Sequence, residues 1–149
     1  MPILANGTLF DNQTLKANMT LESPKVTVKQ TPEKVFEFLT NVENFEKLMP
    51  ENTKFEALDS DSFLFALKGM PEIKLKKKDT QAPSKIILGA AGGKIDFSLT
   101  GDISQVDHET SEVLLTFNGD FNPMMAMMIK GPISNFIKTL AENMPNAIQ

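Results

Sequence analysis

The fold is decided by residues 113–129, VLLTFNGDFNPMMAMMI, in which one hydrophobic period gives way to another. In the first nine residues every second position except Gly119 is apolar, which is typical of a half-buried strand. Asn122 and Pro123 then supply an N-cap and a first helical residue. The sequence predicts a long C-terminal helix from there to about residue 143, kinked at a proline, Pro132, that cannot donate a backbone hydrogen bond.

The period of two also recurs upstream of this stretch. It predicts strands near 22–29, 53–57, 63–67, 73–78, 86–88 and 95–103. Consecutive strands with short turns and one polar face indicate an antiparallel sheet. Gly101 takes an apolar slot in the last of these strands, which indicates a bulge or a close approach to the backbone.

Two short helices are predicted between the first two strands, near 32–40 and 42–48. Thr31 can cap the first helix and Pro32 suits its first position, while Asn41 can cap the second. The predicted fold class is therefore α+β. It consists of a strongly bent antiparallel sheet of six to seven strands around the C-terminal helix, with the two short helices after the first strand.

Length and composition limit the classes of protein that fit. The chain has 149 residues, a net charge of −4 and no cysteine, so we expect one main domain, no cysteine metal site and no nucleic-acid partner. No apolar stretch reaches the length of a spanning helix, and the first residues do not resemble a signal peptide, so the expected location is the cytoplasm. Eleven Phe, nine Met and no Trp or Tyr predict an apolar interior.

The N-terminal residues differ from the rest. We predict that residues 1–18 are an extension and that 19–149 form a single domain, since chain ends are poorly ordered unless they are tied down. Asn6-Gly7 suits a hairpin turn within the extension. The alternative is an arm that pairs with a sheet edge.

Three motifs carry a resemblance to a known family. They are Val26-Thr27-Val28 leading into Thr31-Pro32-Glu33-Lys34-Val35-Phe36, then Phe45-Glu46-Lys47-Leu48-Met49-Pro50, and Gly119-Asp120-Phe121-Asn122-Pro123. With the predicted element order, they resemble the START-like helix-grip superfamily, which includes the major birch-pollen allergen and the bacterial SRPBCC proteins. The chain looks most similar to small single-domain bacterial members and, less closely, to the G subunit of carbon monoxide dehydrogenase.

The resemblance implies a function. Most members with a known role bind apolar small molecules or lipids between sheet and helix, and a minority are cyclases, hydroxylase subunits or chaperone activators. We therefore expect the binding or carriage of a hydrophobic small molecule or lipid-like ligand, without a cofactor. The predicted lining residues are Phe65, Leu67, Leu75, Phe97, Leu99, Leu115, Phe117, Met125, Met128, Ile129 and Phe136.

An interaction module with a filled core is the alternative. Its support is a run of four methionines at positions 124, 125, 127 and 128, because methionine adapts to varied apolar partners. Core packing explains the same run without a partner. Lys74, Lys76 and Lys78 share one strand face, which is either a solvated face or a weak contact for an anionic membrane surface.

Catalysis is the least favoured hypothesis, although the superfamily includes polyketide cyclases. The single histidine, His108, lies in an acidic turn without a nucleophile to activate. Strand parity places Asp96, Asp102 and Asp120 on the solvated face. One histidine and no cysteine also provide no recognisable metal site.

Overall fold

An antiparallel sheet of eight strands forms one bent layer in the computed structural model, which describes residues 17–91 and 96–149. The strands are β2 (Ala17–Glu22), β3 (Val26–Val28), β4 (Lys54–Ala57), β5 (Ser62–Ala66), β6 (Ile73–Gln81), β7 (Lys85–Ala90), β8 (Phe97–Asp107) and β9 (Thr110–Phe121). Their order is β2-β9-β8-β7-β6-β5-β4, and β3 also pairs with β9. The helices are α2 (Pro32–Thr40), the 3-10 helix η3 (Val42–Leu48) and α3 (Pro123–Ala147).

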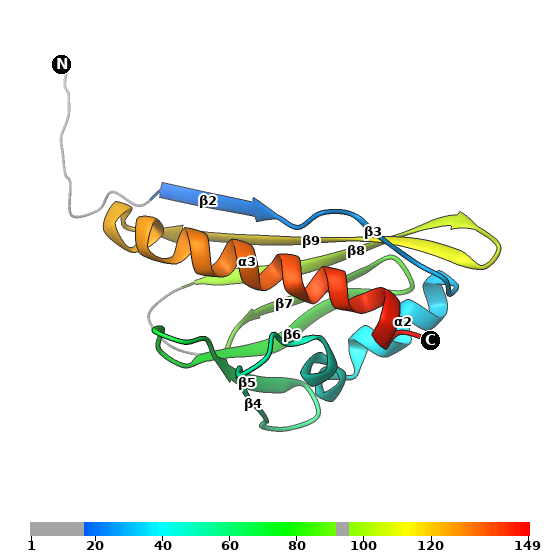
Figure 1. The fold of residues 1–149 in the computed structure, drawn as a ribbon, viewed down its shortest axis with the longest axis horizontal. Coiled ribbons are helices and arrows are strands. Elements are labelled where there is room, and N and C mark those ends of the chain that lie inside the picture. Colours follow the sequence, from blue (N-terminus) through cyan, green and yellow to red (C-terminus); the bar gives the residue numbers. More distant parts are fainter. Residues whose placement is uncertain (1–16, 92–95) are drawn as a thin grey trace, which may run out of the picture.

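The long helix α3 lies along the inner side of the bent sheet. It packs against β9, β2, β3 and η3, while α2 packs against β7, β8 and β9. Figure 1 shows α2 near the end of the molecule where α3 finishes, and the start of α3 at the opposite end. The predicted α+β class and helix-grip arrangement are therefore confirmed.

The first predicted strand, 22–29, is wrong in its bounds. The structure has two segments, β2 and β3, separated at Pro24, which has no N–H to give to a ladder. Ser23 maintains the pairing at the break: its N–H donates to the Leu115 carbonyl at 2.9 Å, and its hydroxyl accepts from the Leu115 N–H at 3.0 Å. Because β2 begins at Ala17, the sheet includes two residues of the predicted extension. The remainder of the extension, with the predicted Asn6-Gly7 hairpin, lies outside the described residues.

The predicted caps are all present. Side-chain oxygens of Thr31, Asn41 and Asn122 accept backbone N–H groups at 3.3, 3.2 and 2.8 Å. These bonds satisfy donors that a helix leaves free in its first turn. The helix α3 runs through Pro132 and continues to Ala147, past the predicted end, because its apolar stripe continues through buried side chains at Met144 and Ile148.

Phenylalanine rings connect the layers of the core. The Phe65 ring on β5 stacks on the Phe136 ring of α3, with centroids 4.5 Å apart and planes at 10°. Phe63 on the same strand stacks on Phe45 of η3 at 5.2 Å. The strands β2 and β9 carry α3 directly, so these stacks attach the far side of the bent sheet to the helices.

Two glycines let other side chains lie close to the sheet. A Cβ on Gly101 would lie 3.2 Å from Ile86 and 3.9 Å from Leu39 of α2, so the predicted close approach is confirmed. A Cβ on Gly119 would lie 2.7 Å from the Phe121 ring and 2.9 Å from the Phe97 Cβ. The absence of a side chain at Gly119 is therefore what lets two aromatic residues pack beside α3.

We predict that Gly119→Ala destabilises the protein by about 1–3 kcal/mol, because buried Phe121 has no room to retreat. Gly89→Ala is the matched control. Its Cβ would meet only Lys78, at 2.8 Å, and that side chain is exposed and can swing away. Urea midpoints at constant m-value measure both changes. Equal midpoints for the two variants would show that the Phe121 ring is not constrained as described.

Candidate functional site

Burial changes systematically along the inner face of the sheet. On three strands the inner residue nearest the start of α3 is half-buried, and the next inner residue along the strand is buried. The half-buried members are Leu67 after β5, Ile73 of β6 and Phe97 of β8, and their buried neighbours are Phe65, Leu75 and Leu99. The sheet is therefore packed at its centre and partly open at one end.

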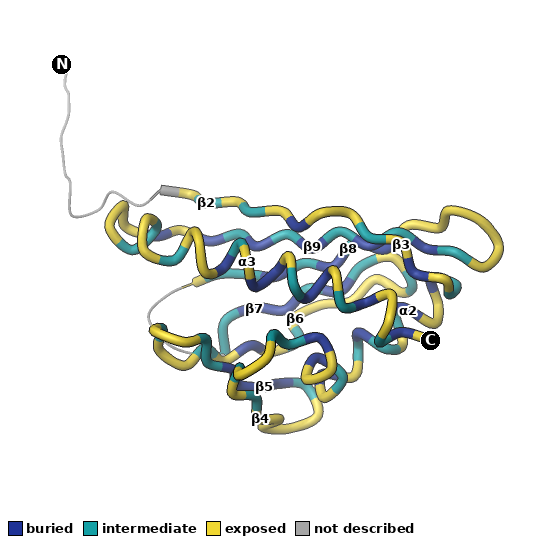
Figure 2. The backbone as a smooth tube through the Cα atoms, viewed as in Figure 1, coloured by how far each residue is buried: buried dark blue, intermediate teal, exposed yellow. Residues whose placement is uncertain are grey.

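The helix α3 shows the same gradient. Met125 and Ile129 in its first half are half-buried, whereas Ile133, Phe136 and Ile137 are buried. Figure 2 shows the first turns of α3 in yellow and teal, with dark blue in the later turns. The first half of the helix therefore covers the open end of the sheet only loosely.

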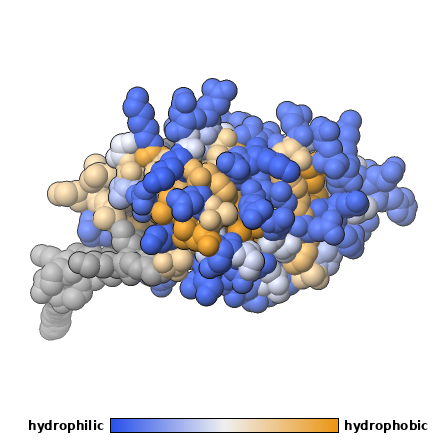
Figure 3. Space-filling view, turned by 90° about the horizontal axis from the view of Figure 1, so that it is seen from below, coloured by the Kyte–Doolittle hydropathy of each residue, from blue (hydrophilic) through white to orange (hydrophobic). Residues whose placement is uncertain are grey.

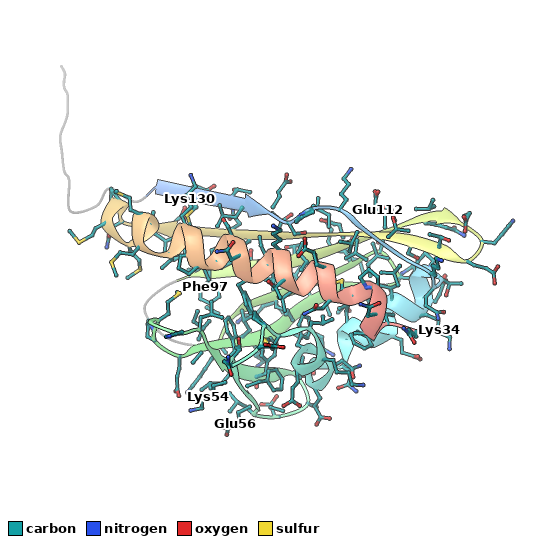
Figure 4. All side chains as sticks on the ribbon, in the orientation of Figure 1. Lys34, Lys54, Glu56, Phe97, Glu112 and Lys130 are labelled. Carbon is teal, nitrogen blue, oxygen red and sulfur yellow. The ribbon has the colours of Figure 1, made fainter. Side chains whose placement is uncertain are left out.

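These observations define a candidate binding site that we call the rim. It consists of Leu67, Met70, Ile73, Phe97, Met125 and Ile129, all half-buried and packed against the core. Figure 4 labels Phe97, the first residue of β8, which lies just below the first half of α3 in this view. Figure 3, a view from below, shows apolar surface open between hydrophilic side chains on that face. The rim can offer a ligand apolar contact on several sides.

The eleven predicted lining residues fall into three groups. Six are buried in the packed core: Phe65, Leu75, Leu99, Leu115, Phe117 and Phe136. Four belong to the rim: Leu67, Phe97, Met125 and Ile129. Met128 is separate from both groups, since it is 69% exposed on the outward side of α3.

Two rim residues, Met70 and Ile73, were not among the predicted lining residues. The alternation of Ile73 with lysines was visible in the sequence. The signal that marks Ile73 is its position as the first residue of β6, where the first half of α3 covers the sheet only loosely.

The buried interior offers almost no polar chemistry. Among the described residues the buried polar side chains are Ser23, Ser62 and Ser111. Ser23 bonds to Leu115 as described, and the Ser111 hydroxyl donates to the Gln30 carbonyl at 2.7 Å. In the part of the chain that the structure describes, no three His, Asp or Glu residues converge as metal ligands would.

The titratable groups with displaced pKa values lie on the surface. A hydrogen bond from the Asp61 backbone N–H, with another from the Ser62 hydroxyl, lowers the pKa of Asp59. The Glu109 N–H does the same for the pKa of Asp107, in the turn that holds the exposed His108. These bonds stabilise turns and do not indicate a reaction.

The acidic residues of the last strands lie on the outer face. Asp102 pairs with Lys85 at 3.6 Å, Asp120 accepts from the Asn18 amide at 3.1 Å, and Asp96 is exposed. None of the three faces the rim, because they alternate with the inner residues of the same strands.

A surface pocket of about 420 Å³ lies apart from the rim. It is formed by α2 and the β6–β7 turn, and its lining residues are Glu33, Phe36, Glu37, Thr40, Ala82 and Pro83. Because α2 packs on the sheet through its other side, this pocket does not connect to the space under α3.

The lysines of β6 play different structural parts. Lys74, Lys76 and Lys78 are exposed on the outer face, where Lys74 lies opposite the buried Leu64. Lys77 instead points towards α2, and its ammonium donates to the Thr40 carbonyl at 2.9 Å. Lys77 follows the inner residue Leu75 by two positions and pairs with the buried Leu88, so strand alternation gives these two orientations.

Lys77 supplies a charge that α2 lacks. The last turn of α2 has no basic residue, and its terminal carbonyls carry the negative end of the helix dipole. The Lys77 ammonium reaches one of them, and Asp61 lies 3.4 Å from the same nitrogen. Lys77 therefore attaches α2 to the sheet.

Within 17–91 and 96–149, no helix is long and apolar enough to cross a membrane.

The comparisons with known proteins show similarity to solved structures. No family model matches the chain, and no curated protein does. Norcoclaurine synthase from Thalictrum flavum is similar at 10% identity with a TM-score of 0.67, over 98% of this chain and 96% of that one. The structure of norcoclaurine synthase from the same plant in complex with dopamine and hydroxybenzaldehyde is similar at 8% identity with a TM-score of 0.61, over 95% of each chain. A START superfamily protein from Mycobacterium smegmatis is similar at 12% identity with a TM-score of 0.67, over 87% of this chain and 96% of that one.

At such identities the likeness establishes the fold alone. The chain has the helix-grip fold of START-like proteins, as the sequence motifs indicate.

We predict that Lys77→Met destabilises the protein by about 1 kcal/mol, because the Thr40 carbonyl loses a charged donor at a partly exposed site. Lys76→Met changes an exposed neighbour of the same type and should stay within about 0.5 kcal/mol of the original. Urea unfolding of the three proteins measures the difference. If both variants unfold at one midpoint, Lys77 does not hold α2.

Proposed function

We propose that the protein binds a hydrophobic small molecule or a lipid-like ligand at the rim, between the sheet and the first half of α3. The observation that carries this proposal is the burial gradient, in which six apolar side chains of the sheet, the β5–β6 connection and α3 remain half-buried around a packed core. Ligand sites are mostly apolar and concave, and they place few polar groups. The rim has such a composition: its six side chains are apolar, and the buried polar side chains of the described residues are three serines.

The location differs from a cavity in the middle of the grip. The Phe65–Phe136 stack fills the space under the second half of α3. A ligand would therefore lie towards the start of the helix, where Phe97 and Ile129 have unused apolar surface. The complex of norcoclaurine synthase with dopamine and hydroxybenzaldehyde supports the idea that this fold can hold small molecules.

Binding is better supported than catalysis. A polyketide cyclase-type enzyme gains from an inward acid or base near the ligand. The described titratable groups with displaced pKa values are exposed: Asp59 and Asp107 lie on surface turns, and Glu72, which precedes Ile73, forms an ion pair with Lys54 at 2.6 Å. We also propose that the protein is one of the small single-domain bacterial START-like proteins, with a distant likeness to the carbon monoxide dehydrogenase G subunit. Its proposed location is the cytoplasm.

A second, weaker proposal concerns the exposed lysines of β6. Lys74, Lys76 and Lys78 share the outer face of one strand, so they could approach an anionic lipid surface together. Each lysine would contribute on the order of 1 kcal/mol at low salt. The long stem of Lys74 beside buried Leu64 offers a simpler explanation for that residue, since lysine stems cover apolar surface.

The first test is the binding of Nile red, an apolar dye whose emission rises when it leaves water for an apolar site. We expect Ile129→Gln to weaken dye binding roughly tenfold, because an amide placed in an apolar site costs about 1–2 kcal/mol without a partner. Position 129 is a half-buried helix site and Gln is a good helix former, so the fold should survive.

Phe36→Ser is the control, because Phe36 lines the surface pocket beside α2. It should leave dye binding unchanged. The reverse pattern, with loss only in Phe36→Ser, would move the ligand to that pocket and remove the rim from the proposal. Native mass spectrometry of freshly purified protein, followed by organic extraction, would identify the class of any ligand that remains bound.

The lysine proposal has its own test. Lys74→Glu with Lys76→Glu should abolish any salt-sensitive sedimentation with phosphatidylserine vesicles, while Lys138→Glu, an exposed site on α3, should not. Sedimentation that is equal for all the proteins would rule out the lysine face as a membrane contact.

A further inference from the structure

The start of α3 exposes methionines to solvent. Met124, Met127 and Met128 are 74%, 82% and 69% exposed, and no other side chain of the described residues is as exposed among the large apolar types. Their spacing of three and four places them on one outward stripe of the helix. Figure 4 shows sulfur atoms projecting at this end of the molecule. We call these three residues the methionine face.

The outward stripe changes character along the helix. Further along the same stripe stand Asn135, Lys138 and Glu142, of which the first two follow Gly131 by four and seven positions. All three are polar or charged, as a solvated helix face should be. The first two turns, from Pro123 to Ile129, contain no charged residue at all. The methionine face therefore has the composition of a covered surface.

The chain before β2 begins next to this face. Ala17, the first residue of β2, pairs with Phe121, which directly precedes the Asn122 cap of α3. Residues 1–16 are therefore attached beside the first turn of the helix. The first ten of them, MPILANGTLF, carry no charged side chain and include Leu9 and Phe10.

We propose that residues 1–10 dock on the methionine face of their own chain. Neither residues 1–10 nor the methionine face carries a charged side chain, both are rich in apolar side chains, and methionine accommodates apolar partners of irregular shape. A tethered segment has an effective concentration on the order of millimolar near its site. With a dissociation constant of a few hundred micromolar, the segment would therefore occupy the methionine face about 80% of the time. A partner from solution lacks this advantage.

A membrane fits the methionine face less well. The three exposed lysines that could hold an anionic surface lie on the outer face of β6, while α3 lies on the inner side of the sheet. One flat surface cannot meet both. The docking of residues 1–10 goes beyond the proposed ligand and does not depend on it, since the methionine face points away from the rim.

Oxidation by hydrogen peroxide tests the docking in the full chain, because a covered thioether reacts more slowly than an open one. The readout is the rate of sulfoxide formation at positions 124, 127 and 128, by mass spectrometry of peptides. We expect Leu9→Ser with Phe10→Ser to raise these rates roughly fivefold, the inverse of the uncovered fraction. Asn12→Ser with Gln13→Ser, a change of polar residues just after the docking segment, should leave them unchanged.

Met144 is fully buried in α3 and reports whether the fold is intact, so its rate should stay equal and slow in all proteins. Equal rates at the methionine face in all three proteins would overturn the proposal. Protection that grows with protein concentration would assign the face to a second copy, and protection that appears only with neutral lipid vesicles would assign it to a membrane. Either result also overturns docking by residues 1–10.

Discussion

The stack of Phe65 on Phe136 is the contact on which the grip depends. The helix α3 packs directly on β9, β2 and β3, at one side of the sheet, whereas β5 is five places away from β2 in the strand order. A centroid distance of 4.5 Å between the two rings brings the far side of the sheet to the helix. Phe63, two residues before Phe65 on the same strand, stacks on Phe45 of η3 at 5.2 Å, so neighbouring rings of β5 join the far side of the sheet to both helices.

Much of the fold could be predicted because its local signals agree with one another. Strand parity, the caps at Thr31, Asn41 and Asn122, and the glycine at 101 all indicate the same architecture. The first strand was predicted less well, since the break at Pro24 is bridged by Ser23 and Leu115, which lie 92 positions apart. Periodicity cannot register such a bond, because the two residues meet only in the folded sheet.

The candidate site could be predicted in kind but not in place. An apolar surplus under a helix is visible in the composition, and four rim residues were among the predicted lining set. Phe65 is buried in the core, whereas Phe97 is half-buried at the rim. The difference depends on how far each residue lies along its strand from the start of α3, and alternation shows only which face a residue is on. Lys77 shares the inner face with Leu75 by alternation, but only the folded chain brings the Thr40 carbonyl, 37 positions away, within 2.9 Å of its ammonium.

The two halves of α3 give the molecule an uneven resistance to opening. The second half is held by fully buried side chains, including Leu140 and Met144, so opening it disrupts the packing of the core. The first half has half-buried or exposed side chains, and Pro132, which gives up one backbone bond, stands between the halves. Opening of that end therefore costs less than the global free energy of unfolding. That end of the domain can therefore open by local fluctuation while its core remains intact.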